Sequence, residues 1–394
     1  MPLAVLPAAL AAFWIMAGFG VLFPVLPYFS QQLGLSMWEY AWLLGVYPAV
    51  GVLAGPLWGR FSDRFGRRPA IALGLAGFGL SFVLFGLGQG FAELFGARVL
   101  GGALGAAALP AVFAYAADVS PPERRSAAMG VVGAALGLGL AFGPALGGAL
   151  SGYGLRVPFF AAGGIAVLGG LAVWALLPES LTSAVRESQA AHRGRLESRG
   201  LTGPRIARAL FPYLLVGFLL SMARLAIDVT VAFLVADRLG RGPASVGALL
   251  FGLGLLAFAL QGGAIRPLVA RLGDARVYAA GVVLMGAGLL SVIWVQSWAA
   301  VIVSGCLVVS GFALHTPTLT ALLSRAAEGV QGEAQGLNAS VQSLARFAGP
   351  IVFAPLYDWA PWAPFALAAG LCALALAAGA GRISPVRPAL PSAR

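Results

Sequence analysis

Long apolar stretches alternate with short polar ones along nearly the whole chain. Each stretch is about 20 residues long, the length of helix that crosses the hydrocarbon of a bilayer. Barrel strands would be about ten residues long and alternate in polarity, so the pattern predicts an all-α membrane protein with twelve transmembrane helices. The predicted spans are 6–28, 40–59, 69–89, 93–117, 126–149, 157–177, 210–235, 244–265, 277–296, 299–322, 335–357 and 362–381.

The distribution of arginine predicts how these spans are oriented. All 25 basic residues are arginines, and 19 of them fall on one side if both termini share that side. The opposite side holds Arg156, Arg238 and Arg241, whereas Arg98, Arg224 and Arg346 fall within spans. Cytoplasmic loops carry the excess of positive charge. We therefore expect both termini to be cytoplasmic, in a protein of the cell inner (plasma) membrane.

Composition excludes several other classes of protein. Hydrophobic residues make up 60% and charged residues 10% of the chain, against about 25% charged residues in soluble domains. The net charge of +11 does not indicate nucleic-acid binding, because most arginines serve topology. The two cysteines lie in separate apolar stretches and indicate no metal site. Without lysine there is no phosphate-binding loop of an ATP-driven pump. We expect no enzymatic activity, no metal and no cofactor beyond coupling protons.

The two halves of the chain repeat each other. A shift of 207 places Gly55, Arg64 and Gly66 on identical residue types, and a shift of 206 does the same for Gly143 and Pro144. Parallel repeats of this kind build one large class of secondary transporters, with the substrate site between the halves. The sequence predicts two pseudo-symmetric six-helix bundles, 1–177 and 210–394, joined by a polar cytoplasmic linker, 178–209.

A stretch rich in glycine and arginine follows the second span. Its glycines allow helices to approach and the chain to turn, and its aspartate can pair with the arginines or lie at a helix N-terminus. A topology anchor would need only the arginines. The pattern resembles the cytoplasmic signature of the major facilitator superfamily, which implies a latch between the halves that holds the outward-facing state. The residues that we call the latch are Gly55, Gly59, Asp63, Arg64, Gly66, Arg67, Arg68 and Asp118.

Spans 4 and 5 extend the resemblance. Arg98 and the glycines after it are similar to the family's fourth-helix motif, which implies a role for this arginine in proton coupling. Packing alone would explain each glycine of span 5, since glycines four apart make a smooth helix face. Their order is nevertheless similar to the signature of antiporters, and the whole chain resembles twelve-span drug:proton antiporters, including tetracycline exporters. This antiporter motif comprises Gly139, Gly143, Pro144, Gly147 and Gly148.

Ionisable residues inside a span are costly and therefore candidates for function. Arg224 and Asp228 are four residues apart in the middle of span 7, so they share one helix face. They could form a neutral pair that only lowers the cost of burial, or Asp228 could carry the coupling proton while Arg224 tunes its pKa. His315 is a further candidate, although a histidine beside threonines can also be a purely structural, hydrogen-bonded residue.

A substrate cavity is predicted from the aromatic residues and from one polar stripe. Asn338, Gln342 and Arg346 follow one another at intervals of four on span 11, so they share a face that suits a wet cavity better than lipid. Spans 1 and 3 lack the acidic residues of tetracycline exporters, so we do not expect metal–tetracycline recognition. The aromatic candidates are Trp14, Phe19, Tyr47, Phe113, Tyr115 and Phe233.

These features favour a proton-coupled exporter of hydrophobic or amphipathic small molecules that works by alternating access. Its partners would be the substrate, protons and the lipid bilayer, with the chain acting as a monomer. One alternative is a sugar or metabolite efflux transporter, in which Arg98 and the polar stripe bind polar or anionic groups. Another, from a different class, is a receptor or scaffold of the same fold that transports nothing.

Overall fold

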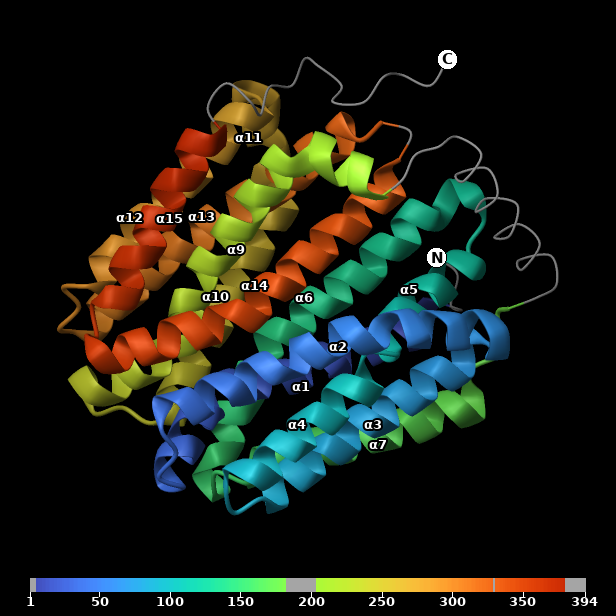
Figure 1. Ribbon diagram of the computed structural model, residues 1–394, viewed down its shortest axis with the longest axis horizontal. Coiled ribbons are helices and arrows are strands. Elements are labelled where there is room, and N and C mark those ends of the chain that lie inside the picture. Colours follow the sequence, from blue (N-terminus) through green and yellow to red (C-terminus); the bar gives the residue numbers. More distant parts are fainter. Residues whose placement is uncertain (1–4, 182–202, 329, 380–394) are drawn as a thin grey trace. The chain divides into compact units, whose positions relative to one another are not determined.

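The computed structural model describes residues 5–181, 203–328 and 330–379, and the regular structure within these ranges is helical. Its contacts form two compact units (Figure 1). The first comprises Met1–Arg193 with Arg241–Gly254, and the second comprises Gly194–Gly240 with Leu255–Arg394. Most of the predicted linker, 178–209, lies outside the described residues, so the predicted domain boundaries stay a prediction.

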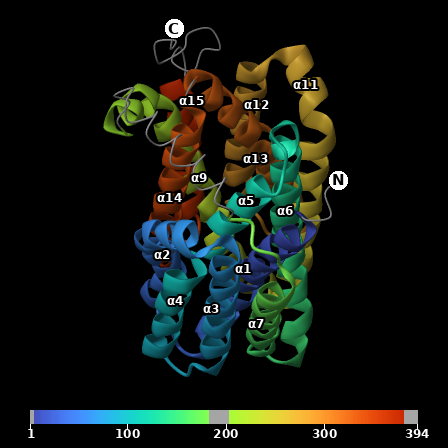
Figure 2. The same ribbon diagram turned by 90° about the vertical axis from the view of Figure 1, so that its right-hand side faces the viewer.

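The first unit contains the helices of the first six predicted spans. They are α1 (Leu6–Gln32), α2 (Met37–Phe65), α3 (Arg67–Leu87), α4 (Phe91–Gly105), α5 (Ala108–Asp118), α6 (Arg125–Leu150) and α7 (Val157–Leu176). Short 3₁₀ turns, Pro122–Arg124 and Ser151–Tyr153, lie at the two ends of α6. Helices α3 and α7 lie side by side in both views of the unit (Figures 1 and 2).

The fourth span is broken into α4 and α5 at Ala106 and Ala107. Pro110 follows four residues after Ala106. A proline has no N–H to donate, and its ring clashes with the carbonyl four residues before it. The single helix predicted over 93–117 is therefore two helices joined by a short turn.

The second unit is built mainly from α9 (Gly203–Leu239), α12 (Asp274–Val292), α13 (Trp298–Ala326), α14 (Gln331–Trp359) and α15 (Ala363–Gly379). Between α9 and α12 the chain forms α10 (Pro243–Ala259), a π-helical turn (Leu260–Ala264) and α11 (Ile265–Leu272). The boundary between the units falls within α10, after Gly254. Each of the twelve predicted spans thus corresponds to helix, as the sequence predicts.

Helices α14 and α15 differ from the other helices in hydropathy or length. Within the described residues, ten helical segments are long and apolar enough to cross a membrane, and α15 is a shorter apolar helix. Helix α14 is 29 residues long but carries the polar stripe, which lowers its hydropathy. Together with the solved structures described below, this arrangement confirms the all-α membrane fold.

Exposed aromatic residues mark the predicted non-cytoplasmic ends of the helices. Tryptophan and tyrosine concentrate where a membrane meets water, because each ring has an apolar body and a polar edge. The large exposed side chains beside these loops are Trp38, Tyr153, Trp294, Trp359 and Trp362, with exposures of 56%, 83%, 72%, 74% and 49%. Their positions are those expected of helix ends at a membrane surface.

The second helix is longer than its hydropathy predicts. The sequence places residues 60–65 in a loop, but α2 continues to Phe65 and α3 begins at Arg67. Backbone hydrogen bonds, not side-chain polarity, decide whether a helix continues, so the polar end of α2 simply extends beyond the apolar part. Gly66 alone separates the helices, and its φ of +119° favours glycine.

Helix pairing repeats between the two units. In the first unit α1 packs on α6, and α3 packs on α7. In the second unit the corresponding pairs form: α9 packs on α14, and α12 packs on α15. The internal repeat detected in the sequence is therefore also a repeat of tertiary contacts.

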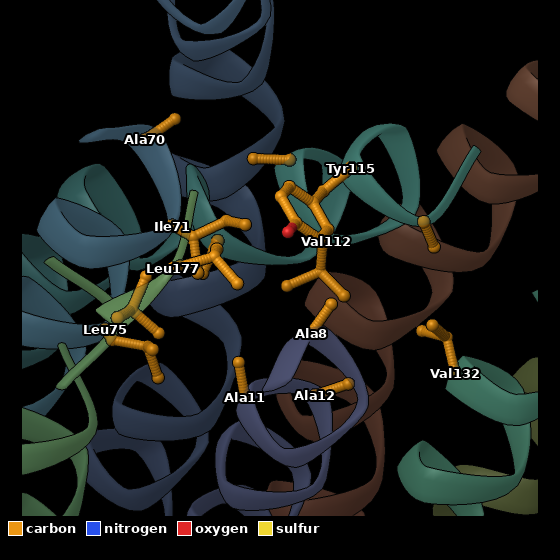
Figure 3. Packing of buried hydrophobic residues seen from close by; sticks show 14 of the residues in the cluster. Ala8, Ala11, Ala12, Ala70, Ile71, Leu75, Val112, Tyr115, Val132 and Leu177 are labelled. Carbon is orange, nitrogen blue, oxygen red and sulfur yellow. The ribbon is translucent and has the colours of Figure 1, made fainter. Parts of the chain in front are cut away.

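A buried cluster holds together the half of the first unit that is predicted to face the cytoplasm (Figure 3). Ala8 of α1 lies beside Val112 of α5, and Ala12 of α1 and Ile71 of α3 belong to the same cluster. Small side chains on α1 let the neighbouring helices approach, and close packing is the main attraction between helices in lipid. The core thus depends on shape more than on large apolar side chains.

Helices α1 and α6 run in the same direction and approach each other closely along a row of glycines on α6, Gly139, Gly143 and Gly147. A Cβ atom added at Gly147 would lie 2.9 Å from the Val21 carbonyl oxygen, and one at Gly20 would lie 2.7 Å from Cδ of Pro144. At Gly139 and Gly143 an added Cβ would overlap the backbone of α1. These glycines of the antiporter motif are therefore required by packing within the first unit.

We predict that Gly143→Ala destabilises the protein by about 1–3 kcal/mol, because the new methyl group has no space against α1. Gly137→Ala on the same helix is the matched control, since a Cβ there meets no atom within 4 Å. The thermal unfolding of the two variants in detergent measures the difference. Equal unfolding temperatures would show that α1 and α6 can separate without cost.

Candidate functional site

The latch is built around one buried guanidinium, that of Arg67. Its terminal nitrogen lies 2.7 Å from Oδ1 of Asp63, and its Nε lies 3.1 Å from Oδ2 of Asp118. The same terminal nitrogen donates to Oγ of Ser62 at 2.9 Å. The Arg67 side chain is 4% exposed, that of Asp118 is 7% exposed and that of Asp63 is 30% exposed. The end of α2, the start of α3 and the end of α5 are thus joined by charge-assisted bonds.

Glu179 completes this network, although the sequence analysis gave it no role. Its carboxylate accepts from the backbone N–H groups of Arg67 at 2.8 Å and Arg68 at 3.1 Å. These are among the N–H groups that a helix leaves unpaired at its N-terminus, where negative charge is favoured. A Cβ at Gly66 would overlap the Glu179 carboxylate. Glycine at this position therefore serves both the turn and the cap.

The other latch residues take less central positions. Gly55 and Gly59 lie on α2 with no atom within 4 Å of an added Cβ, so no close helix approach explains them within the described residues. Arg64 and Arg68 stack on aromatic rings, Arg64 over Phe65 at 5.4 Å and Arg68 over Trp174 at 5.1 Å. These two arginines suit the topology role that the sequence also suggests.

The second unit contains a counterpart of the Arg67–Asp118 pair with the charges exchanged. Asp274 opens α12, and its Oδ2 lies 2.8 Å from a guanidinium nitrogen of Arg325 near the end of α13. The shift of 207 residues that relates the repeats maps Arg67 onto Asp274 and Asp118 onto Arg325. The signal was therefore present in the sequence, but a search for identical residues misses a pair with inverted charges.

Arg224 and Asp228 form the ion pair that their spacing predicts. Nitrogens Nε and Nη2 of Arg224 each lie 3.1 Å from Oδ1 of Asp228. The guanidinium also lies over the ring of Phe312 from α13, 4.4 Å from its centre. The side chains are 22% and 17% exposed. This geometry is required both by a purely structural ion pair and by a pair in which Asp228 carries the proton. A transport experiment on an Asp228 variant distinguishes the two interpretations.

Arg98 is buried in the first unit with a different set of partners. Its Nε donates to the carbonyl oxygen of Leu43 at 3.0 Å, and its guanidinium lies 4.8 Å from the centre of the Tyr47 ring. Tyr47 in turn meets Phe19 edge to face at 4.8 Å. The structure thus brings together three residues that the sequence nominated separately.

A cavity of about 80 Å³ lies within the second unit, between α9, α13 and α14. It receives three of the predicted site residues, His315, Asn338 and Gln342. Its other lining residues are Tyr213, Gly217, Leu220, Ser221, Phe312, Thr316, Leu319, Thr320 and Leu323. Arg346 follows on the same helix, exposed and outside this lining.

The aromatic candidates for the substrate cavity are dispersed. Trp14 and Phe113 are half-buried, whereas Tyr115 is part of the buried cluster of the first unit. Phe233 is buried beside Tyr357, with 6.0 Å between ring centres. None of these four lines the cavity of the second unit, and their contact with substrate stays a prediction.

Comparison with known proteins decides the family. The model of the Major Facilitator Superfamily matches residues 8–266 and 213–394. The chain belongs to the Major Facilitator Superfamily. It is 33% identical over 356 residues to Multidrug resistance protein 2 of Bacillus subtilis (strain 168), covering 89% of this chain and 88% of that protein. It is 25% identical to Quinolone resistance protein NorA of Staphylococcus aureus (strain MSSA476), covering 91% of each.

Solved structures of the superfamily share the fold. A D-xylose–proton symporter superposes with a TM-score of 0.74 at 19% identity, covering 98% of both chains. The human organic anion transporter MFSD10 superposes with a TM-score of 0.67 at 23% identity, covering 96% of this chain and 100% of that one. The resemblance based on the latch and the antiporter motif is confirmed, and the protein is a multi-pass membrane transporter of this superfamily.

We predict that Glu179→Ala exposes the first amides of α3 and lowers stability by about 1 kcal/mol, the usual effect of losing a helix cap. Hydrogen–deuterium exchange should accelerate at the backbone amides of Arg67 and Arg68. Glu179→Gln should show a smaller acceleration, because glutamine keeps a carbonyl oxygen that can accept from these amides. Glu123→Ala, which removes an exposed acid nearby, is the control. Unchanged exchange in Glu179→Ala would remove Glu179 from the network.

Proposed function

We propose that the protein is a proton-coupled exporter of hydrophobic or amphipathic small molecules. The observation that carries this proposal is the similarity, over about nine-tenths of the chain, to proteins named for resistance to many drugs and to quinolones. The complete latch and the glycine row of the antiporter motif support an antiporter. The proposed setting is the plasma membrane with both termini cytoplasmic, as the arginine distribution predicts, and the proposed unit is a monomer without a cofactor.

Proton coupling is assigned to Asp228. Among the carboxylates of the described residues, this is the one in the middle of a membrane helix; the others lie near helix ends or in turns. Its partner Arg224 is held by the Phe312 ring as well, so the guanidinium can remain in place when the carboxylate takes up a proton. A protonated Asp228 would leave the arginine unpaired, and this change in charge balance can bias alternating access.

The latch is the part of the protein that we assign to the conformational change of the transport cycle. Arg67 ties α2, α3 and α5 together at the predicted cytoplasmic side, and Asp63 is the most exposed member of the triad. Asp63 is therefore the latch carboxylate that is most accessible from outside the triad. We propose that the buried pair of Arg67 and Asp118 keeps the first bundle rigid, while the more exposed contact between Arg67 and Asp63 opens and closes during the cycle.

We predict that Asp228→Asn abolishes transport driven by a pH gradient and retains binding or exchange. The amide cannot exchange a proton but can still accept a hydrogen bond from Arg224. Proteoliposomes with an imposed pH gradient and a panel of neutral and cationic fluorescent dyes provide the assay. Full gradient-driven transport by the variant would remove Asp228 as the carrier, and wild-type transport that ignores the gradient would contradict proton coupling itself.

We predict that Asp63→Ala reduces transport at least tenfold with the protein still present in the membrane, because Arg67 keeps Asp118 but loses its second carboxylate. Asp358→Ala is the matched control, since Asp358 is an exposed acid near the C-terminal end of α14, in the second unit. Dye efflux and membrane abundance are measured in the same cells. Equal efflux in both variants would reduce the stretch around Asp63 to a topology anchor.

A further inference from the structure

The cavity in the second unit contains polar atoms that the protein leaves without partners. His315 is 4% exposed, and neither of its ring nitrogens has a hydrogen-bond partner in the described structure. The hydroxyl of the adjacent Thr316 is also buried and unpaired. Buried polar groups are paired in the great majority of native structures. Three unpaired atoms around one cavity therefore indicate that something else completes their hydrogen bonds.

The types of unpaired atom restrict what that partner can be. A neutral imidazole has one N–H donor and one acceptor nitrogen, and a threonine hydroxyl both donates and accepts. The side-chain amides of Asn338 and Gln342 in the same lining are also mixed donors and acceptors. An ammonium group offers no acceptor, and an ionised carboxylate offers no donor. A hydroxyl or a carboxamide offers both.

Charge in the lining points to the same class of ligand. Within the described residues, no acidic residue and no arginine lines the cavity. The nearby guanidinium of Arg224 is already engaged by Asp228 and by the ring of Phe312, which forms one wall. A charged group entering the cavity would lose its hydration without gaining an opposite charge. The lining suits an uncharged polar group.

The size of the cavity limits how much of a molecule can enter. An engineered apolar cavity of about 150 Å³ holds benzene, and a single water needs a cavity of about 10–15 Å³. A cavity of about 80 Å³ is therefore too small for an aromatic ring but large enough for a carboxamide or a hydroxyl-bearing carbon. Leu220, Leu319 and Leu323 add apolar surface, against which the first carbons behind such a group can pack.

We propose that this cavity binds an uncharged group that both donates and accepts hydrogen bonds, a carboxamide or hydroxyl, carried by a larger apolar molecule. His315 supplies the two central hydrogen bonds, and Thr316 with the α14 amides orients the group. This inference deepens the proposed function, on which it rests, because it selects neutral hydrogen-bonding drugs among the amphipathic substrates.

Ring-¹⁵N-histidine provides a direct reporter of the cavity. The chain has two histidines, His192 and His315, so His192→Gln protein, purified through a tag without histidine, leaves one labelled ring. In liposomes, 2-naphthamide should shift both ring-nitrogen resonances of His315. The same scaffold as 2-methylnaphthalene or as 2-naphthyltrimethylammonium should not. Unchanged resonances with all three probes would mean that water alone fills the cavity, and an equal shift with the methyl compound would mean apolar packing alone; either result overturns the proposal.

Substitution of the histidine tests the energetics. We predict that His315→Leu weakens 2-naphthamide binding at least tenfold in equilibrium dialysis, and that His315→Gln, which keeps a donor and an acceptor, recovers part of the loss. Thr318→Val is the matched control, because the Thr318 hydroxyl already donates to backbone carbonyls of α13 and is absent from the cavity lining. Equal binding by His315→Leu and the wild type would overturn the proposal.

Binding and transport fail separately in this design. If the wild type transports no dye with or without a pH gradient, but the resonances of His315 respond to 2-naphthamide, the proposed exporter function is wrong and the cavity remains a binding site. If dye transport is intact and the histidine resonances do not respond, the function stands and the substrate class assigned to the cavity is wrong.

Discussion

Hydrocarbon offers no hydrogen-bond partner, so each polar group placed in the membrane must be satisfied by the chain itself. The backbone meets this demand through helices. The arginines meet it in a different way at each site: Arg98 donates to the carbonyl of Leu43 and faces Tyr47, and Arg224 pairs with Asp228 beneath Phe312. The cavity around His315 departs from this rule with three unpaired atoms in one place, and for that reason it carries an inference about ligands.

The same demand explains two arginines on the side that is predicted to be non-cytoplasmic, where positive charge is usually scarce. Arg156 donates to the carbonyl of Gly88 at 3.1 Å, just beyond the end of α3. Arg238 donates to the carbonyl of Ile293 at 2.9 Å, just beyond the end of α12. A helix C-terminus has unpaired carbonyls and partial negative charge, and a guanidinium satisfies both. Helices α3 and α12 are equivalent in the repeat. In both units an arginine therefore binds the carbonyls at the end of this helix, but Arg156 comes from the turn before α7 and Arg238 comes from α9.

Sequence predicts well what depends on local pattern. Hydropathy was sufficient for the spans, and the i,i+4 spacing was sufficient for the contact between Arg224 and Asp228. The pattern did not predict the role of Glu179, because that role requires the chain after α7 to return to the start of α3 at Arg67, which is 112 residues earlier in the sequence. It also missed the Asp274–Arg325 pair, since the repeat preserves the interaction while exchanging the residue types. Contacts between distant segments are set by packing, which a pattern along one segment does not contain.

The Arg67–Asp118 pair and the Asp274–Arg325 pair occupy equivalent positions in the two units, but they differ in burial and therefore in strength. Arg67 and Asp118 are both nearly fully buried, at 4% and 7% exposure, so removing either leaves a charge that water cannot reach. In the second unit Asp274 is 9% exposed, but Arg325 is 60% exposed, and such a pair contributes little because water and salt screen it. Asp118 and Arg67 therefore form a rigid contact at the predicted cytoplasmic side of the first unit, and Glu179 caps the helix that carries Arg67. The corresponding contact in the second unit can open at small cost, so the two halves, alike in helix pairing, differ in how firmly their ends are tied.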